Sequence, residues 1–260
     1  WGSVLAVWGV IFVVVFFAVF ARGLPDTSAL YDVDRQPSIT YLDRNGALIA
    51  TRGTQMAPPV DLDALPDYVP AAFIAIEDRR FYYHPGFDPI GMSRAIMTNM
   101  RAGRVVQGGS TLTQQLAKNL FLTPDQNLRR KAQELILAVW LELKFSKEEI
   151  LALYLNRVYF GAGAYGIEAA SQRYFDKSAD NLTVGEAALL AGLLKAPSRY
   201  SPLSESERAA TRATVVLNEM EEAGVITAAQ RAEAVLQPVR VSRTLATQHA
   251  QYFVDWLDKE

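Results

Sequence analysis

The chain has 260 residues, enough for one domain of ordinary size with some additional elements. Half of the residues are apolar and the formal net charge is -2, so the sequence lacks the basic footprint of a nucleic-acid-binding protein. It contains no cysteine and only two histidines, His84 and His249, which excludes disulfides, thiolate metal sites and multi-histidine metal centres.

The N-terminal run, residues 1–21, carries no charge and is rich in Val, Phe, Ala and Ile. About 20 such residues span the hydrocarbon core of a bilayer as a helix. The run is too long for the apolar part of a secretory signal and lacks an obvious cleavage site. It therefore predicts a retained transmembrane anchor. The alternative, a buried core helix, requires a partner surface on every side.

The next segment, residues 22–68, is rich in Pro, Asp and Gly and predicts a stem. Within it, residues 39–42 and 47–50 are β-prone and flank the dipeptide Asn45-Gly46. Asn-Gly between two such runs is a strong signal for a tight hairpin turn. The stem is therefore predicted to contain a small β-hairpin.

Residues 69–235 show helix signals without competing strand alternation, so the main domain is predicted to be mainly α. Four predicted capping boxes are Ser146/Glu149, Thr183/Glu186, Ser204/Glu207 and Thr227/Gln230. Further helix starts follow Asp88-Pro89 and Ser110-Thr111, and helix ends are indicated at Gly103 and Gly224. An amphipathic helix is predicted from apolar residues at 128, 132, 135, 136, 139 and 143.

The last segment, residues 236–260, lies beyond the predicted helical domain. Gln237 to Val241 is predicted to be a strand, and residues 252–256 open another element.

Glu77 is the first candidate catalytic residue. On a continuous helix it shares a face with Phe73 and Ile74 before it and Phe81 after it. Desolvation on an apolar face prepares a carboxylate to accept a proton. The alternative is an exposed acid near a helix end, paired with Arg80.

A second candidate begins with Gly108-Gly109-Ser110-Thr111. Glycines followed by hydroxyl groups at a helix start form a cradle for an anion or for sugar hydroxyls. Gln114 and Lys118 follow one turn apart on one helix face. A simple capped helix after a glycine loop is the plainer alternative.

The third candidate is Arg130-Lys131 with Glu134. The spacings i,i+4 and i,i+3 place both cations on one helix face with the acid. A solvated helix surface shows the same pattern. The functional alternative is a site where a diphosphate meets Lys and Arg while Glu134 orients them or a metal ion.

Together these segments resemble the bacterial peptidoglycan glycosyltransferases (glycosyltransferase family 51). The first family motif is met by Glu77, Asp78, Phe81, His84 and Gly86. The second is met by Gly108, Gly109, Ser110, Thr111, Gln114 and Gln115. The third is met by Arg130, Lys131, Glu134, Ala138, Leu141 and Glu142. The fourth is met by Lys147, Ile150, Leu151, Tyr154, Leu155, Asn156, Tyr159, Phe160 and Gly161.

The resemblance covers roughly residues 40–235 and implies a lysozyme-like, mainly α fold acting on lipid II. Glu77 is implied to be the general base of an inverting transfer that forms β-1,4 glycan and releases undecaprenyl diphosphate. Glu134 is implied to be the second catalytic acid and the ligand of a divalent metal, Mg²⁺ or Mn²⁺, with no organic cofactor. The implied substrate-binding residues are Asp78, Phe81, His84, Ser110, Thr111, Gln114, Gln115, Lys118, Asn119, Arg130, Lys131, Asn156 and Lys195.

The expected partners are lipid II, the growing lipid-linked glycan, the membrane and other wall-synthesis proteins, with no nucleic acid. The expected location is the bacterial inner membrane, as a single-pass protein whose catalytic domain faces the periplasm or the exterior. His249 to Asp255 resembles the linker to the transpeptidase domain of class A penicillin-binding proteins. This resemblance implies that residues 236–260 begin that linker and that the chain is the N-terminal part of a bifunctional protein. Two other functions remain as alternatives, a lysozyme-like lytic enzyme and an inactive membrane scaffold.

Overall fold

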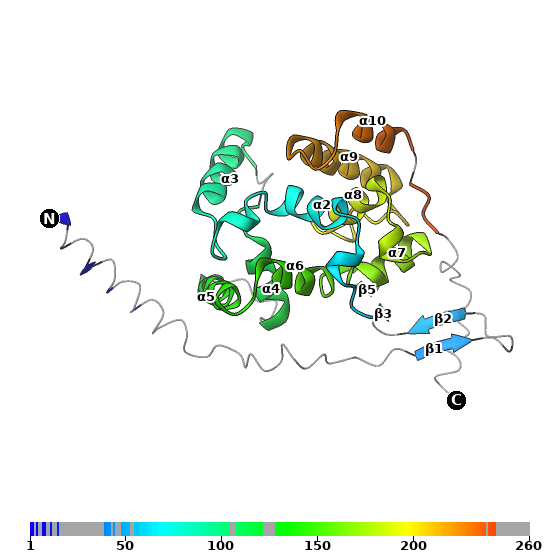
Figure 1. The fold of residues 1–260 in the computed structure, drawn as a ribbon, viewed down its shortest axis with the longest axis horizontal. Coiled ribbons are helices and arrows are strands. Elements are labelled where there is room, and N and C mark those ends of the chain that lie inside the picture. Colours follow the sequence, from blue (N-terminus) through cyan, green and yellow to red (C-terminus); the bar gives the residue numbers. More distant parts are fainter. Residues whose placement is uncertain are drawn as a thin grey trace. The chain divides into compact units, whose positions relative to one another are not determined.

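The computed structural model describes residues 57–104, 108–121, 128–237 and 239–242. It also describes the backbone of 39–42, 48–52 and 55–56, and the single positions 1, 2, 4, 7, 8, 11, 15 and 44. The fold is mainly α-helical, as the sequence predicts (Figure 1). The chain divides into two compact units, each made of two sequence segments. Unit 1 combines Trp1–Asp34 with Arg80–Ile150, and unit 2 combines Arg35–Arg79 with Leu151–Glu260.

Unit 1 is built around the packing of α4 (Leu112–Phe121) on α5 (Leu128–Lys144). Its other elements are η3 (Phe81–Tyr83), α3 (Pro89–Ala102) and the start of α6 (Lys147–Leu155), which ends in unit 2. The largest fully buried side chains of unit 1 are Phe81, Leu112, Leu116, Leu137, Leu141 and Ile150. Burial of these side chains is the main favourable term that holds α4 and α5 together.

The helix α3 begins and ends where the sequence predicts. The Asp88 carboxylate accepts a hydrogen bond from the Ile90 amide, and Pro89 occupies the first helical position. Gly103 ends the helix with a left-handed φ of 61°.

The buried face of α5 differs from the predicted one. Glu134, Leu137, Ala138 and Leu141 are buried, whereas Leu143, which the prediction placed on the buried stripe, is 84% exposed. The helix carries apolar residues on both faces, so periodicity identified the helix but could not show which face meets α4. The outcome places Glu134 within the buried face.

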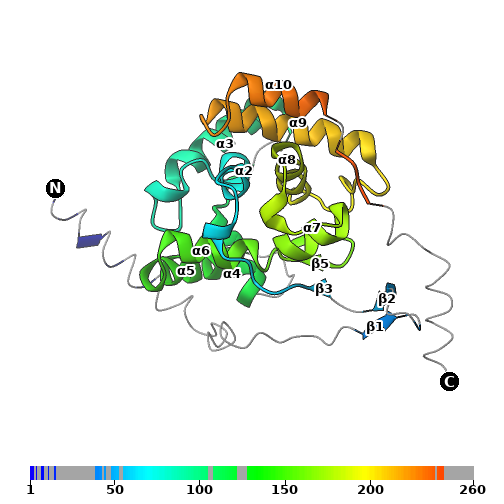
Figure 2. The same cartoon turned by 45° about the vertical axis from the view of Figure 1, so that its right-hand side comes forward.

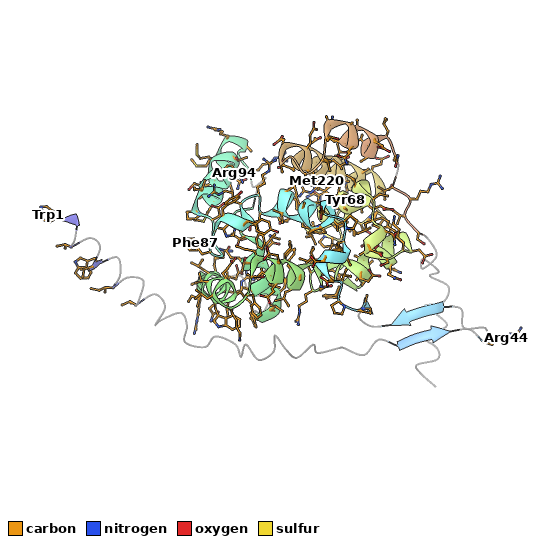
Figure 3. All side chains as sticks on the ribbon, viewed as in Figure 1. Trp1, Arg44, Tyr68, Phe87, Arg94 and Met220 are labelled. Atoms are coloured by element: carbon orange, nitrogen blue, oxygen red, sulfur yellow. The ribbon has the colours of Figure 1, made fainter. Side chains whose placement is uncertain are left out.

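Unit 2 is organised around α2 (Tyr68–Glu77), which packs against α8 (Val184–Leu193) and α9 (Ser206–Glu222) (Figures 1 and 2). The helix α10 (Ala228–Leu236) packs on α8 and α9. The Tyr68 hydroxyl donates to the Leu182 carbonyl at 2.7 Å, and Met220 of α9 is fully buried (Figure 3). Further helical elements among the described residues of this unit are η2 (Leu62–Ala64), α7 (Ile167–Phe175) and η4 (Ala179–Asn181).

The predicted hairpin is confirmed as β1 (Ile39–Leu42) paired antiparallel with β2 (Leu48–Arg52). The turn residues Asn45 and Gly46 lie outside the described residues. A second, three-stranded sheet was missed by the sequence analysis. In it, β5 (Ala164–Tyr165) pairs with both β3 (Gln55–Met56) and β4 (Tyr159–Gly161). These strands are too short to show alternation, and their connection needs positive φ at Gly161, Ala162 and Gly163.

Three of the four predicted capping boxes are confirmed: Ser146/Glu149, Thr183/Glu186 and Thr227/Gln230. The fourth, Ser204/Glu207, is wrong, because α9 begins at Ser206 without a side-chain cap. The amides of Ser204 and Glu205 both donate to the Ser201 carbonyl. This local turn delays the helix start by one residue, because Glu205 rather than Ser204 occupies the N-cap position.

The ends of the chain add little to the observed fold. The strand predicted at 237–241 is not formed at the described positions 237 and 239–241. Fourteen of the 21 residues of the predicted anchor, and residues 243–260, lie outside the described residues. Among the described residues, no helix is long and apolar enough to cross a membrane. The predicted domain bounds at 21, 68 and 235 stay predictions.

Candidate active site

Glu77 is the last residue of α2 and is half-buried. One turn earlier, Phe73 is fully buried with its ring edge-on to Phe160 at 5.9 Å. Asp78 ends the helix, and its amide donates to the Ile74 carbonyl. The predicted continuation of this apolar face to Phe81 is wrong, because the helix has ended and Phe81 belongs to η3.

Tyr154 is a member of this site that the sequence analysis noted only as a motif position. Its side chain is fully buried. Burial raises the pKa of the Tyr154 phenol well above its ordinary value, and the negative charges of Glu77 and Asp78 raise it further. The charges of both carboxylates are therefore close enough to affect the ionisation of one buried hydroxyl. We call these three residues the Glu77 site.

Arg79, the residue after Asp78, holds the chain to α9 through two ion pairs. Its guanidinium lies 2.5 Å from the Glu219 carboxylate and 2.9 Å from that of Glu222, both on α9. Burial lowers the pKa of Arg79, but these two acids outweigh it and leave the pKa above its ordinary value. The final turn of α2 is thereby tied to α9.

A second polar cluster lies in unit 1 around Lys131. Its ammonium group donates to the Glu134 carboxylate at 2.7 Å, the Ser110 hydroxyl at 2.8 Å and the Gln114 side-chain carbonyl at 3.4 Å. Arg130 approaches the other Glu134 oxygen at 3.3 Å. We call these five residues the Glu134 cluster. Glu134 is only 3% exposed, so a simple solvated helix face does not describe it.

The start of α4 holds part of this cluster in place. The Thr111 hydroxyl donates to the Gly86 carbonyl at 2.7 Å and accepts from the Gln114 amide at 3.2 Å. The predicted capped helix is therefore present, and it also brings Ser110 and Gln114 to Lys131. Gln115 is half-buried, whereas Lys118 and Asn119 are exposed on α4.

Two of the predicted substrate-binding residues, Phe81 and His84, lie in the interior of unit 1. Phe81 is fully buried and His84 is 6% exposed. The His84 Nδ1 atom accepts from the Gly86 amide at 3.2 Å. Gly86 has φ +87°, and a Cβ atom there would lie 3.0 Å from the Ala138 backbone. This first-motif loop therefore packs directly on α5.

Asn156 and Lys195, also predicted to bind substrate, belong to unit 2. The Asn156 amide donates to the carbonyls of Val60 and Ala152, and its oxygen accepts from the Val60 amide at 2.8 Å. It thus joins the chain near residue 60 to the end of α6. Lys195 is exposed just after α8. Their roles toward substrate stay predictions.

The residues around Glu134 set limits on a metal site. Among the described residues no group of three or more His, Asp or Glu side chains could hold a metal ion. Glu134 Oε1 accepts no hydrogen bond within the described part of the chain, but it forms the ion pair with Arg130 at 3.3 Å. Mg²⁺ is often bound by one or two carboxylates together with substrate phosphates. The metal role predicted for Glu134 therefore stays a prediction.

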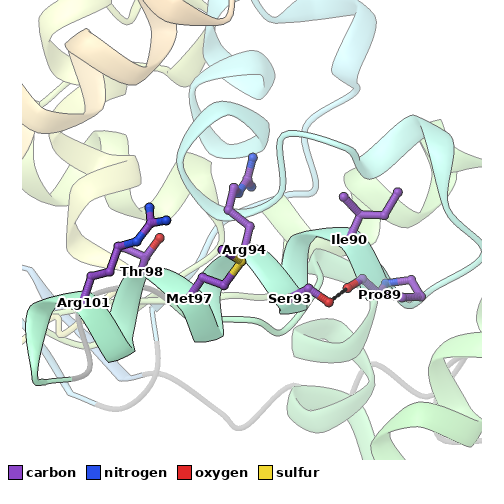
Figure 4. Close-up of a pocket in the computed structure, with 7 residues that line it drawn as sticks. All are labelled: Pro89, Ile90, Ser93, Arg94, Met97, Thr98 and Arg101. Atoms are coloured by element: carbon purple, nitrogen blue, oxygen red, sulfur yellow. Dashed lines mark hydrogen bonds between the residues drawn. The ribbon is translucent and has the colours of Figure 1, made fainter.

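A hollow of about 500 Å³ on α3 contains none of the predicted site residues (Figure 4). It is lined only by residues of α3, among them Ile90, Arg94 and Met97. Within it the Ser93 hydroxyl donates to the Pro89 carbonyl. We assign it no part in the chemistry.

The chain matches the family model for transglycosylases over residues 45–221. It is 46% identical to penicillin-binding protein 1A of Aquifex aeolicus over 241 residues, covering 93% of this chain and 33% of that protein. Penicillin-binding protein 1A of Escherichia coli is 47% identical over 207 residues, covering 80% of this chain and 24% of that protein. The chain thus spans between a quarter and a third of these curated relatives.

Among solved structures, the 2.6 Å crystal structure of penicillin-binding protein 1A from Haemophilus influenzae is 26% identical. The match covers 80% of this chain and 21% of that one, with a TM-score of 0.48, too low to establish a shared fold. The family model spans most of the chain and includes every motif residue of both polar sites. The chain therefore belongs to the transglycosylase family and carries its peptidoglycan glycosyltransferase domain.

Proposed function

We propose that this domain polymerises lipid II into β-1,4 glycan with inversion, using Glu77 as the general base. The observation that carries this proposal is the Glu134 cluster, in which a buried carboxylate holds Lys131 and Arg130 beside the Ser110 hydroxyl. Such an arrangement suits a diphosphate, because fixed cations and hydroxyl donors bind its oxygens.

Glu77 would carry out the proton-transfer step. It removes the proton of the acceptor sugar's 4-hydroxyl as that oxygen attacks the anomeric carbon of the donor. The bond from the anomeric carbon to the diphosphate breaks, and an α-linked donor yields a β-1,4 product. A positioned base typically contributes about 10²–10⁴-fold to such a step. The half-buried position of Glu77, at the end of an apolar helix, suits this role.

Leaving-group departure would be assisted at the Glu134 cluster. A diphosphate leaves as an anion and needs positive charge rather than a proton donor. Lys131, whose side chain is 50% exposed, and Arg130, at 19%, can supply that charge while Glu134 keeps them in place. Where Mg²⁺ or Mn²⁺ is bound, Glu134 would hold it, and the ion would neutralise diphosphate charge.

The membrane is the proposed working surface. The uncharged run of residues 1–21 has the length of a single anchor. In unit 1, α3 exposes large apolar side chains, with Met92 at 50% and Met100 at 76%. Apolar side chains exposed on one helix fit a lipid surface. An anchored enzyme meets its lipid-linked substrates at high effective concentration. We propose the bacterial inner membrane, with the domain on the periplasmic or external side and other wall-synthesis proteins as partners.

The two alternatives are less well supported. A lytic enzyme needs a general acid against a leaving sugar oxygen, and it has no use for two cations around Glu134. An inactive scaffold has no need of either catalytic acid, yet Glu77 and Glu134 are both present.

Polymerisation of fluorescent lipid II by the detergent-solubilised chain tests the proposal. The wild type should produce glycan ladders that moenomycin abolishes, whereas Glu77→Gln and Glu134→Gln should not. Glu233→Gln, which changes an exposed acid on α10, is the matched control. Shortening of preformed glycan with intact lipid II would instead establish the lytic alternative.

A further inference from the structure

We propose that Lys147 and Glu142 are positioning residues that hold the Glu134 cluster in its working geometry. This inference rests on the proposed function and adds two residues to it. Neither carries a proposed contact with substrate, and neither belongs to the Glu134 cluster. Both lie in unit 1, in the third and fourth motifs.

Glu142 joins α5 to both α4 and α6. One of its carboxylate oxygens accepts from the Lys147 ammonium at 2.8 Å and from the Thr113 hydroxyl at 2.5 Å. The side chains of Glu142 and Lys147 are only 9% and 18% exposed. Because screening by water is weak at such exposure, the pair resists separation more strongly than a surface salt bridge does.

Lys147 extends the same connection to the first motif. Its ammonium group donates to the His84 carbonyl at 2.7 Å and lies 4.4 Å from the centre of the Phe81 ring. The loop that follows, at Gly86, packs on the backbone of α5 near Glu142. One lysine therefore fixes the first-motif loop to the start of α6.

The connection reaches the Glu134 cluster by two routes. Thr113 lies in the first turn of α4, next to Gln114, which Lys131 contacts. Along α5, Glu142 lies eight residues after Glu134, near the same buried face. Loss of the Lys147–Glu142 pair should therefore let the α4 start move relative to α5. Ser110 and Gln114 would then lose their alignment with Lys131.

Stability alone is a weak reason for such a pair. A buried ion pair can often be replaced by apolar side chains without loss of stability, whereas removal of one partner is costly. A positioning role and a purely structural role therefore differ in what happens to molecules that remain folded. Only a positioning role predicts that the folded fraction is catalytically impaired.

The kinetic test compares Lys147→Met, Lys147→Arg and Glu142→Gln with the wild type, at a temperature where thermal melts show each protein folded. Per folded molecule, kcat should fall about tenfold or more in Lys147→Met, since small misplacements are costly. KM for lipid II should change much less. Lys147→Arg should recover most of the activity, and Glu142→Gln, which keeps the shape, should lose about threefold.

The matched control is Lys177→Met, which breaks a partly buried ion pair with Glu186 at 2.6 Å in unit 2. Its kcat per folded molecule should equal that of the wild type. The proposal would be overturned if folded Lys147→Met had the kcat of the wild type. If Lys147→Met does not fold, a wild-type kcat in Glu142→Gln would overturn it instead.

A second readout does not depend on catalysis. Because the chain has no cysteine, Ser110→Cys can carry a single spin label at the start of α4. The label should be more mobile when Lys147→Met or Glu142→Gln is added and unchanged when Lys177→Met is added. Equal mobility in all backgrounds overturns the positioning role. If the wild type makes no glycan, the proposed function fails, and the label still decides whether the pair holds α4.

Discussion

The two acids with proposed catalytic roles sit in contrasting surroundings. Glu134 is buried and lies next to two cations, Lys131 and Arg130. Glu77 ends an apolar helix, and burial first, then the negative charges of Glu77 and Asp78, raise the pKa of the Tyr154 phenol. Fixed cations beside a buried carboxylate form a site that suits the oxygens of a diphosphate. A half-buried carboxylate at the end of an apolar helix suits the proposed general base. We therefore propose proton transfer at the Glu77 site in unit 2 and charge stabilisation at the Glu134 cluster in unit 1.

The largest expected effect separates the two acids kinetically. Glu77→Gln should lower kcat by about 10²–10⁴-fold while KM changes little, because only the proton step loses its base. Glu134→Gln should also raise KM, because Lys131 and Arg130 lose the carboxylate that holds them. Steady-state kinetics with lipid II measure both quantities. Identical kinetic changes in the two variants would remove the distinction.

Gly86→Ala tests how tightly the first-motif loop packs on α5. The substitution should reduce the free energy of unfolding by about 2–4 kcal/mol, because it combines a positive φ with a backbone contact at 3.0 Å. Gly103→Ala is the control, since it also has positive φ but meets nothing within 4 Å. That variant should lose only about 1–2 kcal/mol. Denaturant unfolding measures both, and equal losses would argue against tight packing at Gly86.

Lys131→Met tests the charge-stabilising site. Loss of the proposed charge-assisted bonds between Lys131 and the diphosphate should raise KM for lipid II about tenfold. The salt dependence of KM should weaken too, because fewer cations face the substrate. Lys144→Met changes an exposed lysine near the end of the same helix and should leave KM unchanged. An unaltered KM in Lys131→Met would place the diphosphate elsewhere.

Tyr154 provides a pH test of the Glu77 site. Its pKa is raised in the folded chain, so its stabilising contribution is complete below the unfolded pKa near 10 and is lost as pH rises above that value. Above pH 10 the raised pKa of Tyr154 should reduce the free energy of unfolding by up to about 1.4 kcal/mol per pH unit. Tyr154→Phe should make the alkaline fall less steep. Chemical unfolding between pH 8 and about 11 measures the slope.

The smallest expected effect concerns the helix caps. Thr183→Ala should cost about 1 kcal/mol of folding stability, because Thr183 caps α8 through a complete capping box. Ser204→Ala should cost close to nothing, since Ser204 caps no helix. Equal costs in thermal unfolding would show that the Ser204 hydroxyl has another stabilising role.

Local signals predicted much of this protein, because they depend on neighbours in the chain. Asp88-Pro89 marks the start of α3 and Gly103 marks its end, as expected, and three of the four predicted capping boxes formed. Asn45-Gly46 correctly indicated the β1–β2 hairpin. The order and spacing of the motif residues identified the family, and the family model matches.

Tertiary packing decided what local patterns leave open. Periodicity found α5, but the contact with α4 determined that Glu134 is buried and Leu143 is exposed. The early end of α2 separated Phe81 from the face of Glu77. Tyr154 joined Glu77 and Asp78, and Lys147 joined Glu142, Thr113 and His84, only because distant segments fold together. Spacing along a chain reports which side chains share a face, whereas the partners of that face depend on packing between elements.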